Sequence, residues 1–521
     1  MQAAASTLSH LSISANVARL ELDNLERFGS YTRLHCEDRS YSNVEELQHA
    51  GRLARVLRER GVIPGDRVVV LMPNSPDLTA CFQAIWTIGA VLSPVMPQWT
   101  AAEVGHILQN SGASVVLTIP ALAARVHEAA RGIDTLKHAL VLGETDTDGV
   151  QNIAPERADS ASVDAPVNRS PEDLAMLLYT SGTTGKPKGV MITHANLAAA
   201  VSSASQRNPD MPRYPMLHVL PLTHSFGLIM LKLANAWGCA SVLLPQFDPV
   251  RTLEIVERYR VGYLPVVPTM LLYLLHHSER AKFDVSSLYR LIIGGAALPE
   301  KLRSEFQRVF PCCVEQGYGL SESVAMASAY GDHEPYRPGS AGRPLPGIEV
   351  RIVDERNQPL PSCRAGEICL MGANITPGYW QDPAATREAF RGGWFHTGDV
   401  GYLDEEGYLH ITDRKKDLIV KGGENISPRE IEEAIYLHPA VAEAAVVGIP
   451  DEVFGEEICA VIQLKPGTQV SDEDIRCHVA QHLTKFKVPH RVVFQAALPK
   501  NSTGKIQKRA IRELFARSEA A

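Results

Sequence analysis

Apolar and polar residues alternate along most of the chain in two repeating patterns. Short apolar runs have the length of buried strands, and between them lie longer segments whose apolar residues recur at helical spacing. The expected strands are 67–71, 89–95, 114–119, 174–178, 217–220, 241–244, 262–267 and 291–294. Capping boxes at 42–45 and 100–103 mark the starts of two helices. Strands that alternate with helices predict an α/β fold, with parallel sheets that helices cover on both faces.

The pattern changes after about residue 340. From there to residue 412 the chain has short β runs separated by Gly and Pro turns, which predicts a small β subdomain with a hairpin turn at 405–407. The run 413–417 is too polar for a core, and a compact α+β pattern follows it, with a helix that Ser427 is expected to cap. We therefore expect a large N-terminal domain over residues 1–413 and a small, mobile C-terminal domain over residues 414–521.

Length and composition fit a globular protein of several domains. The chain has 521 residues, too many for one compact core, with 45% hydrophobic and 21% charged residues. Its net charge is −8 and no block of basic residues occurs, so nucleic-acid binding has no electrostatic support. The nine Cys are scattered without a C-x-x-C pair, which favours reduced thiols and a cytoplasmic location over a disulfide framework.

The sequence has no segment with the features of a membrane span or a secretory signal. No window approaches the roughly 18 to 20 uninterrupted apolar residues of a spanning helix. Residues 1–19 lack the basic start and apolar core of a secretory signal, although their Ser content and lack of acidic residues leave a transit peptide open. The last residues, 518–521, carry no peroxisomal address. Peripheral contact with a membrane and a homodimer are both compatible with the sequence.

Residues 179–190 form the most distinctive segment of the chain. They continue the apolar run 174–178, and an Ala-rich helical pattern begins at Thr193, so the expected order is strand, Gly/Ser/Thr/Lys loop and helix. Such a loop can cradle phosphate, because glycines let backbone N–H groups approach an anion, hydroxyls donate hydrogen bonds and lysines neutralise charge. The candidate contacts are Thr180, Ser181, Gly182, Thr183, Thr184, Gly185 and Lys186.

Two alternative interpretations fit this segment less well. A Walker A loop needs Gly where Thr180 stands, and it needs a Ser or Thr hydroxyl where Pro187 stands. A flexible Gly/Ser linker would not be expected to contain two lysines and a proline directly after a buried strand. Phosphate binding is therefore the favoured interpretation of the loop.

The twelve residues of this segment also closely resemble the AMP-binding signature of the acyl-adenylate-forming family. That family includes acyl-CoA synthetases, beetle luciferases and the adenylation domains of peptide synthetases. The resemblance covers roughly residues 30–515, nearly the whole chain. It implies an acid–thiol ligase of lipid metabolism that uses ATP, Mg2+ and coenzyme A. A carboxylic acid and ATP would give acyl-AMP and pyrophosphate, and CoA would then give acyl-CoA and AMP.

The resemblance assigns a nucleotide site to further segments. Within 316–322 it places the Tyr318 ring on the adenine and the Glu322 carboxylate on Mg2+, a hard cation that prefers oxygen ligands. Asp399 and Arg414 match residues that hold the ribose, and a carboxylate can accept hydrogen bonds from both ribose hydroxyls. The remaining implied nucleotide contacts are Gly294, Gly295, Ala296, Gly319 and Ser321.

The implied catalytic residues are Lys505, Glu322, His224 and Thr184. Lys505 closes the segment 499–505, which matches the family's terminal motif. Its ammonium would contact the nucleotide and stabilise the negative charge that develops when a carboxylate attacks the α-phosphate. His224 matches a ring that gates entry of the carboxylate.

The second half-reaction needs a path for a thiol. Residues 421–425 resemble the acyl-CoA synthetase version of a Gly-rich segment, in which Gly422 and Gly423 would let pantetheine pass close to the backbone. Lys416 matches the position of the family's hinge. Rotation of the C-terminal domain about this hinge would replace Lys505 with the Gly-rich segment.

Two departures from related enzymes bear on the substrate. Residues 225–230 contain no acid that could pair with the ammonium of an amino acid. Gly319 and Leu320 stand where acetate-type synthetases place a bulky Trp, which leaves room for a longer or aromatic acid. Medium- or long-chain fatty acids are therefore the first expectation, and aryl or cinnamate-type acids are the second.

Other activities share these motifs. A luciferase would also need a luciferin pocket, and a stand-alone adenylation enzyme would load a carrier protein in place of CoA. A non-enzymatic nucleotide-binding regulator should have lost part of the site. The chain retains Glu322, Asp399, Arg414 and Lys505. The expected partners are thus small molecules, namely a carboxylic acid, ATP and CoA, while the acid, the thiol acceptor and the oligomeric state stay open.

Overall fold

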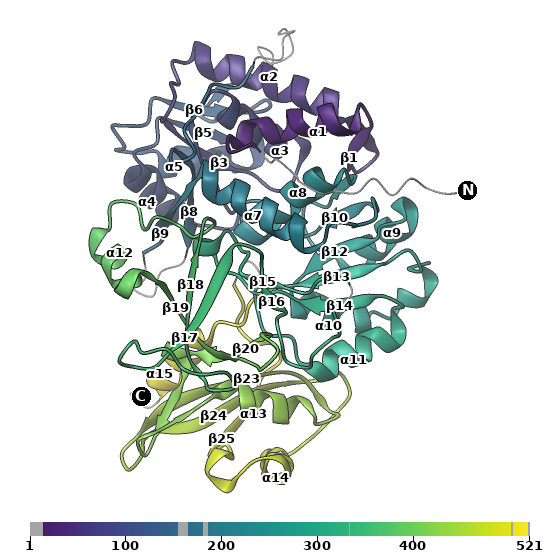
Figure 1. The fold of residues 1–521 in the computed structure, drawn as a ribbon, viewed down its shortest axis with the longest axis vertical. Helices are drawn as coiled ribbons and strands as arrows, with labels where there is room; N and C mark the ends of the chain where they lie inside the picture. The colour runs from purple at the N-terminus through teal and green to yellow at the C-terminus, as the bar shows by residue number, and fades with distance from the viewer. Residues whose placement is uncertain (1–13, 155–164, 181–185, 333, 502–503, 519–521) are drawn as a thin grey trace.

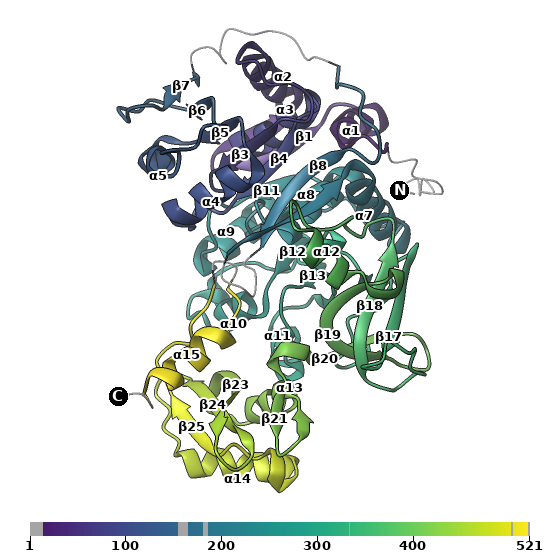
Figure 2. The same ribbon diagram turned by 90° about the vertical axis from the view of Figure 1, so that its left-hand side faces the viewer.

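The computed structural model describes residues 14–154, 165–180, 186–332, 334–501 and 504–518 (Figure 1). These residues form two large sheets with helices, a small antiparallel sheet, and a C-terminal sheet at the far end of the molecule from helix α2 (Asn43–Glu59) (Figures 1 and 2). The arrangement confirms the expected α/β class. No helix within the described ranges is long and apolar enough to cross a bilayer.

The first sheet contains the strands on either side of the phosphate loop. Its strands are β3 (Arg67–Leu71), β4 (Val91–Val95), β5 (Val115–Thr118), β6 (His138–Val141), β7 (Gln151–Asn152), β8 (Leu174–Thr180) and β9 (Lys188–Thr193). Their order is β7-β6-β5-β3-β4-β8-β9, and neighbours are parallel except for antiparallel β8 and β9. The hydrophobic pattern predicts the bounds of β3 but not β9, because β9 begins with Lys188 and Gly189.

The second sheet includes a hairpin from the N-terminal part of the chain. Its strands are β1 (Thr32–Cys36), β2 (Arg39–Ser42), β10 (Met216–His218), β11 (Ser241–Leu243), β12 (Tyr263–Val266), β13 (Arg290–Ile293) and β14 (Cys313–Gln316). Their order is β14-β13-β12-β10-β11-β1-β2, parallel except for antiparallel β1 and β2. β1 pairs with β11, with Leu34 opposite Ser241, so a strand outside the expected alternation completes this sheet.

The helices of the N-terminal part pack on and between these sheets (Figure 1). They are α1 (Leu20–Phe28), α2, α3 (Pro76–Thr87), α4 (Ala101–Ser111), α5 (Ala123–Ala129), α7 (His194–Arg207), α8 (Ser225–Trp237), α9 (Pro249–Tyr259), α10 (Pro268–His276) and α11 (Glu300–Val309). Both predicted capping boxes are confirmed, at α2 and α4. Helix α8 is buried along nearly its whole length in a core that contains residues of both sheets, which explains its apolar character on all sides.

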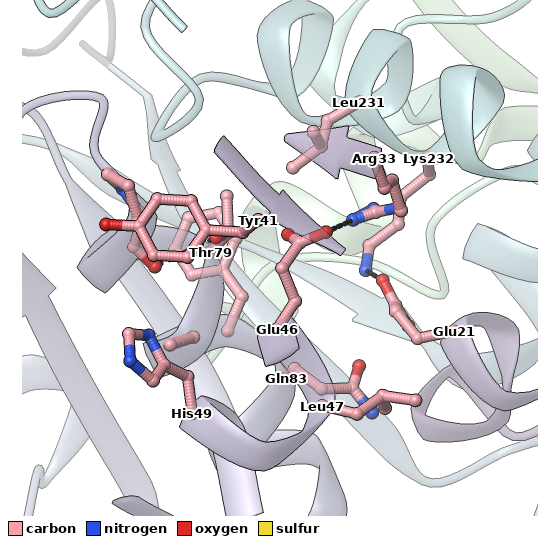
Figure 3. A pocket seen from close by; sticks show the side chains of 13 residues that line it. Glu21, Arg33, Tyr41, Glu46, Leu47, His49, Thr79, Gln83, Leu231 and Lys232 are labelled. Atoms are coloured by element: carbon pink, nitrogen blue, oxygen red, sulfur yellow. Dashed lines mark hydrogen bonds and ion pairs between the residues drawn. The ribbon is translucent and has the colours of Figure 1, made fainter. Parts of the chain in front are cut away.

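A buried ionic network ties the N-terminal segment to α8 (Figure 3). The Lys232 ammonium lies 2.5 Å from the Glu21 carboxylate. Arg33 Nη1 lies 2.7 Å from the Glu46 carboxylate, which keeps these buried charges paired. The four side chains line a small pocket beside α2, α3 and α8 that contains none of the residues expected to bind the nucleotide.

The predicted small β subdomain is a four-stranded antiparallel sheet. Its strands, in spatial order, are β17 (Ile348–Val353), β18 (Gly366–Gly372), β19 (Phe395–Leu403) and β20 (Leu409–Arg414). The turn between β19 and β20 contains the predicted 405–407 segment and is closed by backbone hydrogen bonds between Asp404 and Tyr408 and between Gly407 and Asp404. Helix α12 (Pro383–Ala389) and the short pair β15 (Ser328–Ala329) and β16 (Arg343–Pro344) flank it.

The C-terminal sheet begins a few residues after β20 ends. Its elements are β21 (Ile419–Lys421), β22 (Glu424–Ile426), α13 (Pro428–Tyr436), β23 (Val441–Asp451), β24 (Gly455–Leu464), α14 (Asp472–His482), β25 (Arg491–Phe494) and α15 (Lys508–Ser518). The strand order is β22-β21-β24-β23, with β25 paired to β24.

Helix α13 is capped differently from the prediction. Ser427 occupies its N-cap, but the Ser427 side chain makes no capping hydrogen bond. Instead the Ser427 hydroxyl donates to the Asp413 carboxylate, which also accepts from the Arg429 backbone N–H. A carboxylate from β20 therefore takes the role expected of Ser427, because it lies within reach of the first turn and carries the more favourable charge there.

Candidate active site

The phosphate loop connects two antiparallel strands. Thr180, at the end of β8, lies opposite Lys188 at the start of β9. Lys186 is exposed between them. The expected contacts Ser181, Gly182, Thr183, Thr184 and Gly185 lie outside the described residues. The expected strand–loop–helix order is corrected in one respect: β9 intervenes before α7, which Thr193 caps.

A segment around Tyr379 adds to the edge of β9. Tyr379 forms a β-bridge with Val190, and the Trp380 backbone N–H donates to the Gly189 carbonyl at 2.7 Å. The Tyr379 hydroxyl donates to Glu322 Oε1 at 2.9 Å. Tyr379 thus links the exit of the phosphate loop to the expected metal ligand. Sequence reasoning missed it, although the Gly-Tyr-Trp cluster at 378–380 was the available signal.

Glu322 lies in a short 3-10 turn, Ser321–Ser323. Its backbone carbonyl accepts from the Thr376 N–H at 2.7 Å, so the same segment that carries Tyr379 also fixes the turn. Burial raises the pKa of the Glu322 carboxyl. A half-buried carboxylate whose one oxygen is held by a hydroxyl fits a magnesium ion, which takes one or two carboxylates and completes its shell with phosphates and water.

Two of the expected nucleotide residues, Tyr318 and Arg414, contact a third, Asp399. The Tyr318 hydroxyl donates to Asp399 Oδ2 at 2.7 Å, and Arg414 Nε lies 3.0 Å from Oδ1. Asp399 and Arg414 face each other in the register of β19 and β20. Burial and the neighbouring Asp399 carboxylate raise the pKa of Tyr318 well above its ordinary value, so its hydroxyl remains a donor. Tyr318, Asp399 and Arg414 therefore form one hydrogen-bonded cluster.

The glycines expected beside the base lie at the same edge of the second sheet. Ile293 pairs with Gln316 at the ends of parallel β13 and β14, so Gly294 and Tyr318 follow neighbouring strands. Gly294 packs so closely on Phe226 that an added Cβ would lie 2.9 Å from the ring. A Cβ at Gly319 would lie 2.1 Å from the Ala325 carbonyl carbon. Gly319 faces backbone and therefore requires glycine, whereas a side chain at position 294 would have to displace the Phe226 ring. Gly295 and Ala296 continue this edge.

His224 is the N-cap of α8. Its Nδ1 accepts from the Phe226 backbone N–H at 3.3 Å. Burial, assisted by the positive charge of Lys505, lowers the pKa of His224 to about 4. The ring is consequently neutral near pH 7. Ser225, the first residue of α8, places its hydroxyl 3.4 Å from the hydroxyl of Ser321, which brings the start of α8 next to the Glu322 turn.

Lys505 reaches this region from the C-terminal domain. The preceding Gly504 carbonyl accepts from the Thr269 hydroxyl of α10 at 3.3 Å, and Lys500 Nζ lies 3.2 Å from the Tyr273 hydroxyl. Burial and the neighbouring Arg414 lower the pKa of Lys505 to about 8, while Asp399 acts in the opposite direction. The structure thus brings Lys505 close to His224, Asp399 and Arg414.

The expected thiol segment lies elsewhere. Gly422 and Gly423 form the exposed turn between β21 and β22, with φ of 57° and 86°. Gly422 donates its N–H to the Phe454 carbonyl at 2.8 Å, within the C-terminal domain. Lys416 lies in the 3-10 turn Lys415–Asp417 between β20 and β21. The structure therefore does not bring the glycine turn together with Lys505 and the nucleotide residues.

Comparisons with known proteins agree with this geometry. Residues 23–380 match the family model of the AMP-binding enzyme, and residues 430–505 match the model of its C-terminal domain. The chain is 32% identical to a long-chain-fatty-acid–CoA ligase of Bacillus subtilis (strain 168), over 94% of this chain and 93% of that protein. It is 37% identical to a feruloyl-CoA synthase of Amycolatopsis sp, over 91% of this chain and 93% of that protein.

A solved structure provides a further match. The anthranilate CoA ligase AuaEII in complex with anthranoyl-AMP superposes on this chain with a TM-score of 0.92 at 25% identity. The superposition covers 99% of this chain and 100% of the other. The likeness therefore includes both the sheets of the N-terminal part and the C-terminal sheet.

Replacing Asp399 with alanine should raise the KM for ATP and slow both half-reactions, because the nucleotide stays bound throughout. Loss of charge-assisted hydrogen bonds is expected to lower kcat/KM by the equivalent of ~2–4 kcal/mol. Steady-state kinetics with ATP as the varied substrate test this. Glu405→Ala, which removes an exposed carboxylate from the same hairpin, is the control. Unchanged ATP kinetics in Asp399→Ala would remove Asp399 from the nucleotide site.

The pH profile of ATP-dependent pyrophosphate release should fall on its alkaline side because Lys505 loses its charge there. The ammonium is charged below its pKa of about 8 and neutral above it, so kcat/KM for ATP should decline as the pH rises through that value. This parameter reports the free enzyme and is the one to measure. Lys505→Arg keeps its charge far above this pH, so this fall should disappear whatever the overall rate. If the Lys505→Arg variant loses activity at the same pH, the fall in kcat/KM belongs to another titrating group.

Proposed function

The chain belongs to the AMP-binding enzyme family, and we propose that it is an ATP-dependent carboxylic acid–CoA ligase. The observation that carries this proposal is the position of Lys505, whose ammonium lies near Asp399 and Arg414. These two residues are the ones that would hold the ribose of a bound nucleotide. The α-phosphate follows the ribose directly, which supports a role for Lys505 at the reacting phosphate.

In the first half-reaction, a carboxylate oxygen of the acid attacks the α-phosphorus of ATP. A bond from that phosphorus to oxygen forms, the bond to pyrophosphate breaks, and acyl-AMP remains. The hydroxyl of Tyr318 and the Arg414 guanidinium orient Asp399 toward the ribose. The Lys505 ammonium stabilises the negative charge that builds up on the phosphate. Glu322 would hold Mg2+, which supplies charge neutralisation at the phosphates.

His224 contributes by being neutral. Its pKa of about 4 leaves it uncharged at neutral pH, so it cannot trap the incoming carboxylate in an ion pair. The positive end of α8 and the Lys505 ammonium then provide the attraction for the anion. We propose that the ring turns as the acid enters, which is the gating role that the family resemblance implies.

In the second half-reaction, the CoA sulfur attacks the acyl carbonyl carbon, and AMP leaves. The thiol proton must be lost, and the leaving phosphate oxygen takes up the negative charge. We assign the pantetheine path to the Gly422–Gly423 turn, which has to move because it lies away from Lys505. We propose that the C-terminal domain, expected over residues 414–521, rotates about Lys416 relative to residues 1–413, while Arg414, which precedes the hinge, stays in β20 opposite Asp399. The rotation would withdraw Lys505 and bring in the turn.

We further propose that the acid is apolar. The first turn of α8 contains no acidic residue, and Phe226 packs against Gly294 at the edge of the site. A medium- or long-chain fatty acid is the first candidate, and its support is the fatty-acid–CoA ligase relative. An aryl or cinnamate-type acid is the second candidate. The feruloyl-CoA synthase and anthranilate CoA ligase relatives favour it.

A panel of carboxylic acids with ATP and CoA, scored for AMP release, tests the function and the substrate class together. An apolar acid of about six carbons or more should have the highest kcat/KM, and each further buried methylene should add up to ~0.8 kcal/mol until the pocket is full. Aromatic acids belong in the same panel. The pocket argument is wrong if acetate or an amino acid gives the highest value.

Two variants should separate the half-reactions. Lys505→Ala should slow acyl-AMP formation by roughly 10²–10³, the effect of one well-placed charge, yet convert preformed acyl-AMP and CoA at a near-normal rate. Gly423→Leu should release pyrophosphate in a single turnover but block the thiol step, because its side chain would fill the pantetheine path.

The control for Gly423→Leu is Gly467→Leu. Gly467 also has a positive φ, 77°, with open space where a Cβ would stand, so this variant carries the same backbone strain without touching the turn. Lys416→Pro should spare adenylation and stall the thiol step, since proline fixes φ near −65°. Equal losses in both steps for all three site variants would mean that one rigid site performs both reactions.

A further inference from the structure

Helix α11 of the N-terminal domain lies next to helix α13 of the C-terminal domain (Figures 1 and 2). A lysine side chain of α11 joins the two helices. Lys301 Nζ donates to the backbone carbonyls of Tyr436 at 2.9 Å, Leu437 at 3.4 Å and His438 at 3.2 Å. The Tyr436 and Leu437 carbonyls stand at the C-terminal end of α13, where a helix has a partial negative charge. His438 follows the helix, and its carbonyl also accepts from the Val441 N–H. The lysine of one domain therefore caps a helix of the other.

A carboxylate of α13 also lies near the start of α11. Burial raises the pKa of the Glu433 carboxyl, while Arg429 Nε, 3.8 Å away within the same helix, and the backbone N–H of Glu300, the first residue of α11, act to lower it. The N-cap of α11 is Pro299, whose side chain makes no capping hydrogen bond. A carboxylate is the favourable partner at this positive end of a helix. The C-terminal end of α13 is thus capped by a lysine of the other domain, and the N-terminal end of α11 has a carboxylate of the other domain nearby.

Helix α13 is also held at its other end, close to the expected hinge. Asp413 of β20 accepts from Ser427 and from the Arg429 backbone, only a few residues before Lys416. A helix of this length spans about 13 Å at ~1.5 Å per residue. In a rotation about Lys416 whose axis crosses α13, the end of α13 near Asp413 moves less than the end at Lys301. A contact at the moving end has the greatest influence on the domain arrangement.

We propose that Lys301 and Glu433 form a clasp that positions the C-terminal domain, and with it Lys505, for adenylation. The clasp must open before the thiol step. Lys301 and Glu433 are positioning residues, since neither contacts the nucleotide cluster. The inference rests on the proposed function, because it assumes two half-reactions served by two domain arrangements. A contact made in only one arrangement shifts the equilibrium toward that arrangement by its own free energy.

The test compares variants that remove one charge at nearly constant size. Lys301→Met and Glu433→Gln should each slow single-turnover acyl-AMP formation by roughly tenfold, the order expected for a charged helix cap. Conversion of preformed acyl-AMP and CoA should stay unchanged or become faster. Lys301→Arg keeps the cation and should restore adenylation.

Two matched controls exist in the same domains. Lys282→Met removes a surface lysine that pairs with Glu279 within the N-terminal domain. Glu430→Gln removes a carboxylate of α13 that pairs with Lys487 within the C-terminal domain. Neither pair crosses the domain interface, so both variants should keep both half-reactions at the normal rate.

Hydrogen exchange gives a readout that does not depend on activity. In Lys301→Met the backbone amide of Glu300, which lies near Glu433, should exchange faster, although Glu433 itself is unchanged. Separation of the two helices exposes that amide to water. The melting temperature should stay close to that of the unmodified chain.

The outcomes separate the two proposals. If the unmodified chain forms no acyl-AMP with any acid of the panel, the proposed function is wrong. If it does, and Lys301→Met keeps its adenylation rate and its Glu300 exchange rate, the clasp is wrong. Equal losses in both half-reactions with a lower melting temperature would also overturn the clasp, because they indicate a purely structural contact.

Discussion

The rest of the candidate site depends on the contacts of the Asp399 carboxylate. It joins Tyr318, which follows the second sheet, to Arg414, which ends the small antiparallel sheet. It also offsets the positive charges around Lys505, which arrives from the C-terminal domain. Three parts of the chain that are distant in sequence thus converge on one buried negative group. Without it, Arg414 and Lys505 would repel each other, and the cluster would favour opening until an anion bound.

The predictable parts of the fold are those that local sequence decides. The apolar run of β3 and the capping boxes of α2 and α4 have the predicted positions, because neighbouring residues suffice to form them. Strand β9 could not be predicted, since its polar start suits a loop and only pairing with β8 makes it a strand. Asp413, rather than Ser427, accepts the hydrogen bond from the first turn of α13. The local sequence pattern does not show that Asp413 lies close enough to do so.

The same distinction holds in the site. The sequence motifs assigned both Asp399 and Arg414 to the ribose. The structure shows that the two residues face each other in a hairpin. Tyr379, Lys301 and Glu433 were not predicted, because each acts on a partner that is distant along the chain. No periodicity or motif of the sequence specifies which helix ends meet across a domain boundary. Such contacts follow from how the finished elements pack.

The C-terminal domain contains two segments with proposed functions, and they lie apart in this structure. Lys505 lies at the nucleotide cluster while the Gly422–Gly423 turn is exposed in its own domain. Under the proposed function both must reach the same acyl group, so that function requires a rotation of the domain in every turnover. The contacts that favour one arrangement must then be strong enough to populate it and weak enough to release it, which limits their combined bias to a few kcal/mol. Half-buried ionic caps such as those of Lys301 and Glu433 fall in that range, whereas a large apolar interface would exceed it.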